Sequence, residues 1–185
     1  MVKMFLSLIT AFSLVSCLDA GEPRVLGEWL CGSKVKTFQY RKVSPGMKAE
    51  RFKVAVQRRN DGVDLVRSDS DEPDGYQTLP GKIIEERSWF TLLWTNMAVG
   101  EKQITPKAPK GRDIVVEVLS VDKKLMLMGK GYMDCVTLLV QVPGVQLEKR
   151  IYSWGVGLVR SESYMTMEDL RDHKPSQIEE LIAFR

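Results

Sequence analysis

The chain has 185 residues, of which 44% are hydrophobic and 28% are charged, and its formal net charge is +3. This balance is typical of a globular protein and excludes an intrinsically disordered chain. The small net charge also argues against nucleic acid as a partner, because nucleic-acid-binding proteins need a clustered basic face. The length corresponds to one ordinary domain, which can bury a hydrophobic core without the disulfides or metals that very small domains need.

The N-terminus has the pattern of a secretory signal. Lys3 supplies a positive charge, and a run of mostly apolar residues follows it. The run has the length of a signal peptide and is shorter than the roughly 20 residues that a membrane-spanning helix needs. It ends in Leu14-Val15-Ser16-Cys17, which resembles the lipobox of bacterial lipoproteins. The alternatives are an ordinary secretory signal with a chance cysteine, or a buried N-terminal helix.

The lipobox resemblance implies that the sulfur of Cys17 receives a diacylglyceryl group and that cleavage falls just before this residue. Residues 1–16 would then be the signal peptide, 17–24 the lipid anchor and tether, and 25–185 a single antiparallel β domain. Two or three acyl chains give durable membrane attachment, since each buried methylene contributes about 0.8 kcal/mol. Leu18 stands where an aspartate tends to retain lipoproteins at the inner membrane. We therefore expect a lipid-anchored protein of the bacterial cell envelope, at the outer membrane.

Two cysteines remain once Cys17 is acylated. Cys31 and Cys135 are far apart in the sequence, and outside the cytoplasm such a pair is a candidate disulfide. The alternative is two separate buried thiols, which behave as small hydrophobic side chains. The sequence leaves both alternatives open, because it does not show whether the two Cα atoms lie close enough to be bridged.

Alternating polar and apolar residues dominate the chain after its first 33 residues. Phe52, Val54 and Val56 alternate with polar neighbours, and Asp61-Gly62 soon after them predicts a tight hairpin turn. Short strands separated by frequent turns, without alternating helices, predict a mainly β protein. We expect a single curved antiparallel sheet, arranged as a half-barrel or a sandwich.

Three segments leave details of this sheet to be tested. Residues 83–94 are strongly apolar and form either one bent strand or two strands. Asp122-Lys123 lies between two strand-like runs and predicts a tight turn. Gly155 and Gly157 interrupt a strand pattern, which indicates a bulge or a close approach of another backbone segment.

The C-terminal segment has a helix-start pattern. Ser176 is followed three residues later by Glu179, which is the spacing of a capping box. We therefore expect one short C-terminal helix over residues 179–184. The alternative is a last edge strand, because the apolar residues of this segment do not separate onto one helical face.

The segment from Gly131 to Arg160 resembles a pattern of uncharacterised secreted bacterial β-sheet proteins. The matching residues are Gly131-Tyr132-Met133-Asp134-Cys135-Val136 and Ile151-Tyr152-Ser153-Trp154-Gly155-Val156-Gly157-Leu158-Val159. The resemblance implies paired strands in a secreted or lipidated sheet, with Cys135 as a packing position. It implies no activity.

No motif of catalytic or metal chemistry stands out. The chain has one histidine, His173, and no cysteine pair with the spacing of zinc ligands. It also has no nucleophile elbow and no phosphate-binding loop. We therefore expect a protein that is not an enzyme, with no metal and with no cofactor besides the acyl groups on Cys17.

The aromatic residues are the feature that bears most on function. Trp89, Phe90 and Trp94 lie in one apolar run, and Trp154 lies in the second half of the chain. Such residues are usually part of the core. They could instead contact an apolar ligand. We expect a binding or interaction module for an envelope protein or a lipid. The alternative is a carrier or receptor that holds lipid or lipoprotein acyl chains in a half-barrel cavity.

Overall fold

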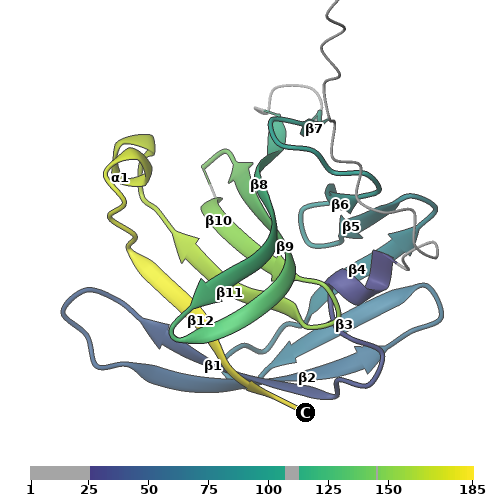
Figure 1. The fold of residues 1–185 in the computed structure, drawn as a ribbon, viewed down its shortest axis with the longest axis horizontal. Helices are drawn as coiled ribbons and strands as arrows, with labels where there is room; N and C mark the ends of the chain where they lie inside the picture. The colour runs from purple at the N-terminus through teal and green to yellow at the C-terminus, as the bar shows by residue number, and fades with distance from the viewer. Residues whose placement is uncertain (1–25, 107–112, 145) are drawn as a thin grey trace, which may run out of the picture.

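A computed structural model describes residues 26–106, 113–144 and 146–185. In these residues, twelve β-strands form one antiparallel sheet that curls into a nearly closed barrel (Figure 1). The strands are β1 (Thr37–Val43), β2 (Glu50–Arg58), β3 (Gly62–Arg67), β4 (Asp74–Leu79), β5 (Lys82–Glu85), β6 (Phe90–Trp94), β7 (Lys102–Thr105), β8 (Ile114–Leu127), β9 (Lys130–Val142), β10 (Gln146–Ser153), β11 (Gly157–Ser163) and β12 (Gln177–Phe184). The prediction of a mainly β protein with a single curved antiparallel sheet is confirmed.

The strand order is simple except at one place. It runs β6-β5-β4-β3-β2-β1-β12-β11-β10-β9-β8-β7. Neighbours in the sheet are therefore neighbours in the sequence, apart from the pair β1–β12. The last strand lies between the two halves of the sheet and hydrogen-bonds to both, which joins them into one wall.

The core follows from the alternation seen in the sequence. Phe38 and Tyr40 of β1 pair across the sheet with Val54 and Phe52 of β2, and all four side chains are buried. Because successive side chains of a strand point to opposite faces, each strand contributes one buried row. The Tyr40 and Phe52 rings stack with their centroids 5.4 Å apart.

Two turn predictions have different outcomes. Asp61-Gly62 does connect β2 to β3 as a hairpin, as predicted. The turn predicted at Asp122-Lys123 is wrong, because β8 continues through it. The chain reverses instead at Met128 and Gly129, whose φ angles of 50° and 75° suit a tight hairpin turn. The resulting β8–β9 hairpin is long and crosses in front of β11 and β12 in the view of Figure 1.

The predicted C-terminal helix is wrong in its position. Residues 179–184 belong to β12, and this strand is not at an edge of the sheet, since it pairs with β1 and β11. The backbone N–H of Ser176 donates to the carbonyl of Ser163, so pairing between strands takes precedence over the capping pattern.

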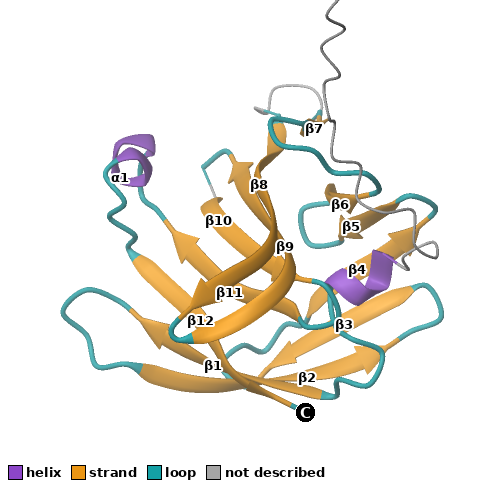
Figure 2. Cartoon of the chain, viewed as in Figure 1, coloured by secondary structure: helices purple, strands orange, loops and turns teal. Residues whose placement is uncertain are grey.

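The structure contains little helix (Figure 2). The α-helix α1 (Met167–Arg171) is capped by Thr166, whose side chain accepts from the Asp169 N–H. The short 3₁₀ helix η1 (Leu26–Trp29) packs against the sheet. In the parts of the chain that the structure describes, no helix has the length and apolar character needed to cross a membrane.

The apolar segment 83–94 forms two strands. β5 and β6 are joined by a turn that contains Trp89, which adopts a φ of 51°. A positive φ is unusual for a bulky residue and is typical of a chain reversal. The alternative of two strands is therefore confirmed over a single bent strand.

Candidate functional site

The barrel wall has a gap where β9 and β12 each lose the neighbouring strand on one side. β9 pairs with β10 only from Cys135 onward, where it lies opposite Ser153. β12 pairs with β11 only as far as Glu180, which lies opposite Arg160. Beyond these points, the first residues of β9 and the last residues of β12 have a strand neighbour on one side only, within the described chain. We call the space between them the edge groove.

The edge groove has a volume of about 730 Å³. Eleven described residues line it: Lys130, Gly131, Tyr132, Met133, Ser153, Trp154, Val156, Leu181, Ile182, Ala183 and Phe184. Lys130 carries the one side-chain charge among these eleven. Met133 and Phe184 are 58% and 49% exposed, which is high for large apolar side chains. Exposed apolar side chains gathered in a concave surface are typical of a binding site.

The turn between β10 and β11 forms one end of the groove, and two glycines fix its position. A Cβ atom on Gly157 would collide with the carbonyl oxygen of Leu30, and the φ of this glycine is +114°. The N–H of Gly155 donates to the carbonyl of Glu28 over 3.1 Å. The turn is thus held against η1 by close backbone contact, as the two glycines predicted. The register between β10 and β11 also shifts just before it, at Ile151.

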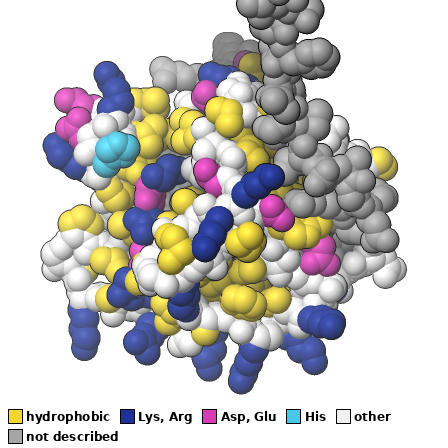
Figure 3. Space-filling view, viewed as in Figure 1, with side chains coloured by type: hydrophobic (Ala, Val, Ile, Leu, Met, Phe, Trp, Pro, Cys, Tyr) yellow, Lys and Arg dark blue, Asp and Glu magenta, His cyan; other side chains and the backbone are white. Residues whose placement is uncertain are grey.

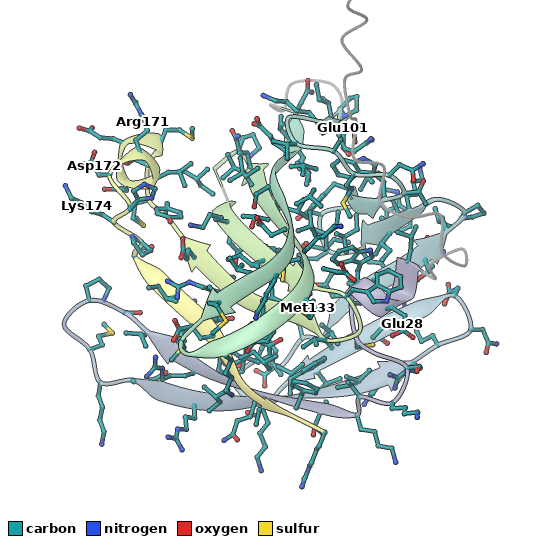
Figure 4. The ribbon with its side chains drawn as sticks, in the orientation of Figure 1. Glu28, Glu101, Met133, Arg171, Asp172 and Lys174 are labelled. Carbon is teal, nitrogen blue, oxygen red and sulfur yellow. The ribbon has the colours of Figure 1, made fainter. Side chains whose placement is uncertain are left out.

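Side chains bridge the groove where strand hydrogen bonds are missing. Lys130 Nζ donates to the carbonyl of Ile182 over 2.6 Å, from the β9 side to the β12 side. Tyr132 Oη lies 3.5 Å from the carbonyl oxygen of Leu181. Figure 4 labels Met133, which lies on the same hairpin. Two carbonyls of β12 therefore interact with side chains in place of a neighbouring strand.

The predicted aromatic ligand contacts do not gather in one cavity. Phe90 and Trp94 are buried in the core, at 1% and 8% exposure. Trp89 is 61% exposed in the turn between β5 and β6. Of the four, Trp154 lies in the edge groove, where its ring meets Trp29 edge-on with the centroids 5.3 Å apart.

Sequence reasoning missed most of the groove. The sequence pattern places Tyr132 and Met133 in a strand and Phe184 in a helix, and it gives no sign of a role for Lys130. The one signal in the sequence was Trp154 beside the two glycines. Large apolar residues in a strand give no sign of whether a neighbouring strand covers them.

The barrel interior contains buried charge beside its apolar core. Arg150 Nη1 donates to Glu85 over 3.0 Å, and Arg150 Nε donates to Glu148 over 2.8 Å. The side chains of these three residues are each 10–12% exposed. Burial raises the pKa of nearby Tyr152 to about 12. Buried charges are costly unless paired, so an acyl chain lying against this triad would be unfavourable.

A second chain of ion pairs runs along the other face of β11 and β12. Glu180 accepts from both Arg41 and Arg160, each over 2.6 Å. Arg160 continues the chain to Glu162, which also pairs with Lys149. Burial alone would raise the pKa of the Glu162 carboxyl. Hydrogen bonds from Lys149 and from the Tyr164 hydroxyl outweigh burial, and this pKa is lowered.

The two described cysteines are separate thiols. Cys31 and Cys135 are both free and buried in the structure, which is the second of the two alternatives left by the sequence. Burial raises the pKa of each thiol above its ordinary value. Such thiols are inert packing groups. The lipid-attachment residue Cys17 lies outside the described residues, as does the whole predicted signal and tether.

The described residues show no group of three or more His, Cys, Asp or Glu side chains arranged to hold a metal ion. In Figure 3, Lys and Arg side chains gather along the lower edge of the molecule, below β1 and β2. Arg51 and Lys53 of β2 are exposed.

No protein-family model matches the chain, and no curated protein matches it. The structure is similar to one described as an exported protein with a YmcC-like fold, from Bacteroides fragilis. The TM-score is 0.51 at 8% identity, over 85% of this chain and 98% of the other. A structure described as a lipoprotein, from Parabacteroides distasonis, gives a TM-score of 0.49 at 9% identity, with the same coverage.

The first of these likenesses defines the class of fold. The chain is a curled, antiparallel, nearly closed β-barrel, and it shares the YmcC-like fold of the Bacteroides fragilis protein. At 8% identity the likeness shows the fold alone.

Proposed function

We propose that this protein is a lipoprotein of the bacterial cell envelope that is not an enzyme, and that it binds another envelope component in the edge groove. Cys17 would carry the lipid and hold the barrel at the membrane surface, at the outer membrane. The observation that carries the binding role is the groove itself. It combines exposed Met133 and Phe184, the partly buried Trp154, and segments of β9 and β12 that have a strand neighbour on one side only.

Two further observations support the proposed localisation of the protein in the cell envelope. The residues Leu14 to Cys17 have the lipobox pattern at the end of a signal-like run. The fold is shared with a protein that is described as exported. Both agree with a mature domain that works outside the cytoplasm.

A second candidate is a carrier or receptor for acyl chains, which is the alternative that the sequence leaves open. The apolar lining of the groove favours it, with Lys130 at hand for an anionic headgroup. Such a ligand would lie in the edge groove and not in the barrel interior, where the Arg150 triad is buried.

Site-specific crosslinking in the native cell tests the binding role. A photoreactive phenylalanine analogue replaces Met133 in the groove, and a matched variant carries it at Met47, which is 74% exposed in the turn after β1. We expect a light-dependent adduct at position 133 and none at position 47. The mass of the adduct distinguishes a protein or glycan partner from a lipid. Equal crosslinking at both positions, or none at either, would contradict the proposal.

A further inference from the structure

The edge groove has the construction of a slot for one more strand. Its two long walls are the start of β9 and the end of β12, each with a strand neighbour on one side only, and the sheet is continuous on either side of them. We propose that the groove receives an extended peptide segment carrying acidic side chains, which adds to the edge of β12 as a strand. The inference rests on the proposed function and names the kind of partner that the groove would bind.

The edge of β12 offers hydrogen-bonding groups in the register that a strand needs. Thr37 and Arg185 exchange both backbone hydrogen bonds, so the N–H and C=O of Arg185 point toward β1. These groups alternate in direction along a strand. The N–H and C=O of Phe184 therefore point away from β1, toward the groove. The carbonyl of Ile182 also faces the groove, where it accepts from Lys130 Nζ.

The length and lining of this edge suit a short extended segment. Leu181–Phe184 spans four residues, or about 13 Å at the rise of a β-strand. Added strands gain affinity from main-chain hydrogen bonds and specificity from pockets for alternate side chains. Trp154, Val156 and Met133 provide apolar contacts for such side chains. Methionine adapts its shape to different partners, so Met133 would tolerate variation in the segment.

The charges around the groove favour acidic side chains in the partner. Lys130 lines the groove, and Lys124 is paired with Met133 across the β8–β9 hairpin. An adjoining hollow of about 410 Å³ shares Ala183 and Phe184 with the groove, and Lys53 and Arg185 also line it. None of the described lining residues of either space is Asp or Glu. Complementary charge of this kind steers a partner and fixes its register.

The Lys130 side chain has to move when a peptide strand binds in the groove. In the structure its ammonium occupies the Ile182 carbonyl, which an incoming backbone N–H would need. On binding, the peptide N–H replaces the ammonium at this carbonyl. Lys130 is then free to pair with a carboxylate of the segment.

The test uses the full mature lipidated chain in lipid nanodiscs and a displayed library of random twelve-residue linear peptides. Selected peptides are synthesised with and without N-methyl groups on alternate backbone amides. Their affinity is measured for the unmodified chain, for Phe184→Pro and for Phe184→Ala. Both variants lose the aromatic ring, but only proline also removes the N–H that faces the groove. Phe184 is 49% exposed, so both variants should keep the fold, which circular dichroism checks.

We expect selected peptides rich in Asp and Glu, with an affinity that falls at least tenfold on N-methylation. Phe184→Pro should weaken binding at least tenfold more than Phe184→Ala. Peptides that bind equally well with N-methyl groups, or equally well to both variants, would overturn strand addition. So would a library that yields no binder. The crosslinking test at Met133 is independent of this one. A lipid or glycan adduct at Met133 would support binding in the groove but would contradict a peptide as the partner.

Discussion

Replacing Arg150 with methionine tests whether the buried ion triad holds the barrel together. Arg150 is the shared cation of Glu85 and Glu148, and all three side chains are nearly buried. Methionine keeps much of the volume but leaves the buried carboxylates of Glu85 and Glu148 without the Arg150 guanidinium. Breaking a buried pair in this way typically costs about 3–5 kcal/mol. The total stability of a domain is about 5–15 kcal/mol, so this is a large fraction.

Urea unfolding followed by tryptophan fluorescence measures the loss, and a thermal scan gives a second reading. One kcal/mol shifts the melting temperature of a domain this size by about 2–4 °C, so we expect a fall of about 6–20 °C. The control is the triple variant Glu85→Gln, Glu148→Gln, Arg150→Met, which should recover most of the stability because these three positions then carry no charge. A loss below about 1 kcal/mol in Arg150→Met would refute the reasoning, since an uncompensated buried charge must cost more.

Three further predictions concern single residues. Glu162→Gln should lose about 1–3 kcal/mol at pH 7, the value of hydrogen bonds to a buried charged group. Because the pKa of Glu162 is lowered in the folded state, its stabilisation is present above the unfolded value of about 4.3 and is lost as the pH falls through the folded pKa. A difference in stability that is the same at pH 7 and pH 3 would count against this. Gly157→Ala should destabilise the fold by more than the roughly 1–3 kcal/mol of backbone strain, because its Cβ would collide with Leu30. Gly155→Ala is the control and should show the backbone strain alone, because nothing lies within 4 Å of its Cβ. Equal losses of stability in thermal scans of the two variants would show that the close contact at Gly157 is absent. Cys31 and Cys135 should react slowly with a thiol reagent at pH 8 in the native protein and fast in urea, with two thiols counted in the mature chain; a count of zero would indicate a disulfide.

The class of fold could be predicted because its determinants are local. Phe52, Val54 and Val56 alternate with polar residues, and Asp61-Gly62 reverses the chain a few residues later. Each of these signals depends on a few adjacent residues and on the period of a strand. The prediction for the C-terminal segment failed because pairing between distant strands decides its outcome.

The C-terminal strand illustrates this limit. Glu179 and Glu180 look like helix residues after a capping serine, but they point to opposite faces of β12. Glu179 pairs with Arg67 and Glu180 with Arg160, each from a different strand. Short apolar segments are ambiguous between helix and strand until their neighbours are known. The neighbours of β12 are about 20 and 140 residues away, as the separations of its ion pairs with Arg160 and Arg41 show.

The edge groove could not be predicted for a related reason. It exists because β10 ends at Ser153 and β11 begins at Gly157, while β9 and β12 continue past them. No property of Met133 or Phe184 alone shows that a neighbouring strand is missing. Gly157 came closest, since its close approach to another segment was correctly expected and this contact fixes the end of the groove.

The proposed localisation of the protein depends on lipid attachment at Cys17. Cells grown with an alkyne-tagged fatty acid, expressing the unmodified chain or Cys17→Ala, test it directly. We predict that the label appears in the unmodified protein in the membrane fraction, that mass spectrometry finds an acylated N-terminal peptide beginning at Cys17, and that Cys17→Ala carries no label. Equal labelling of both proteins, or an unlabelled chain that keeps its first sixteen residues, would contradict the account.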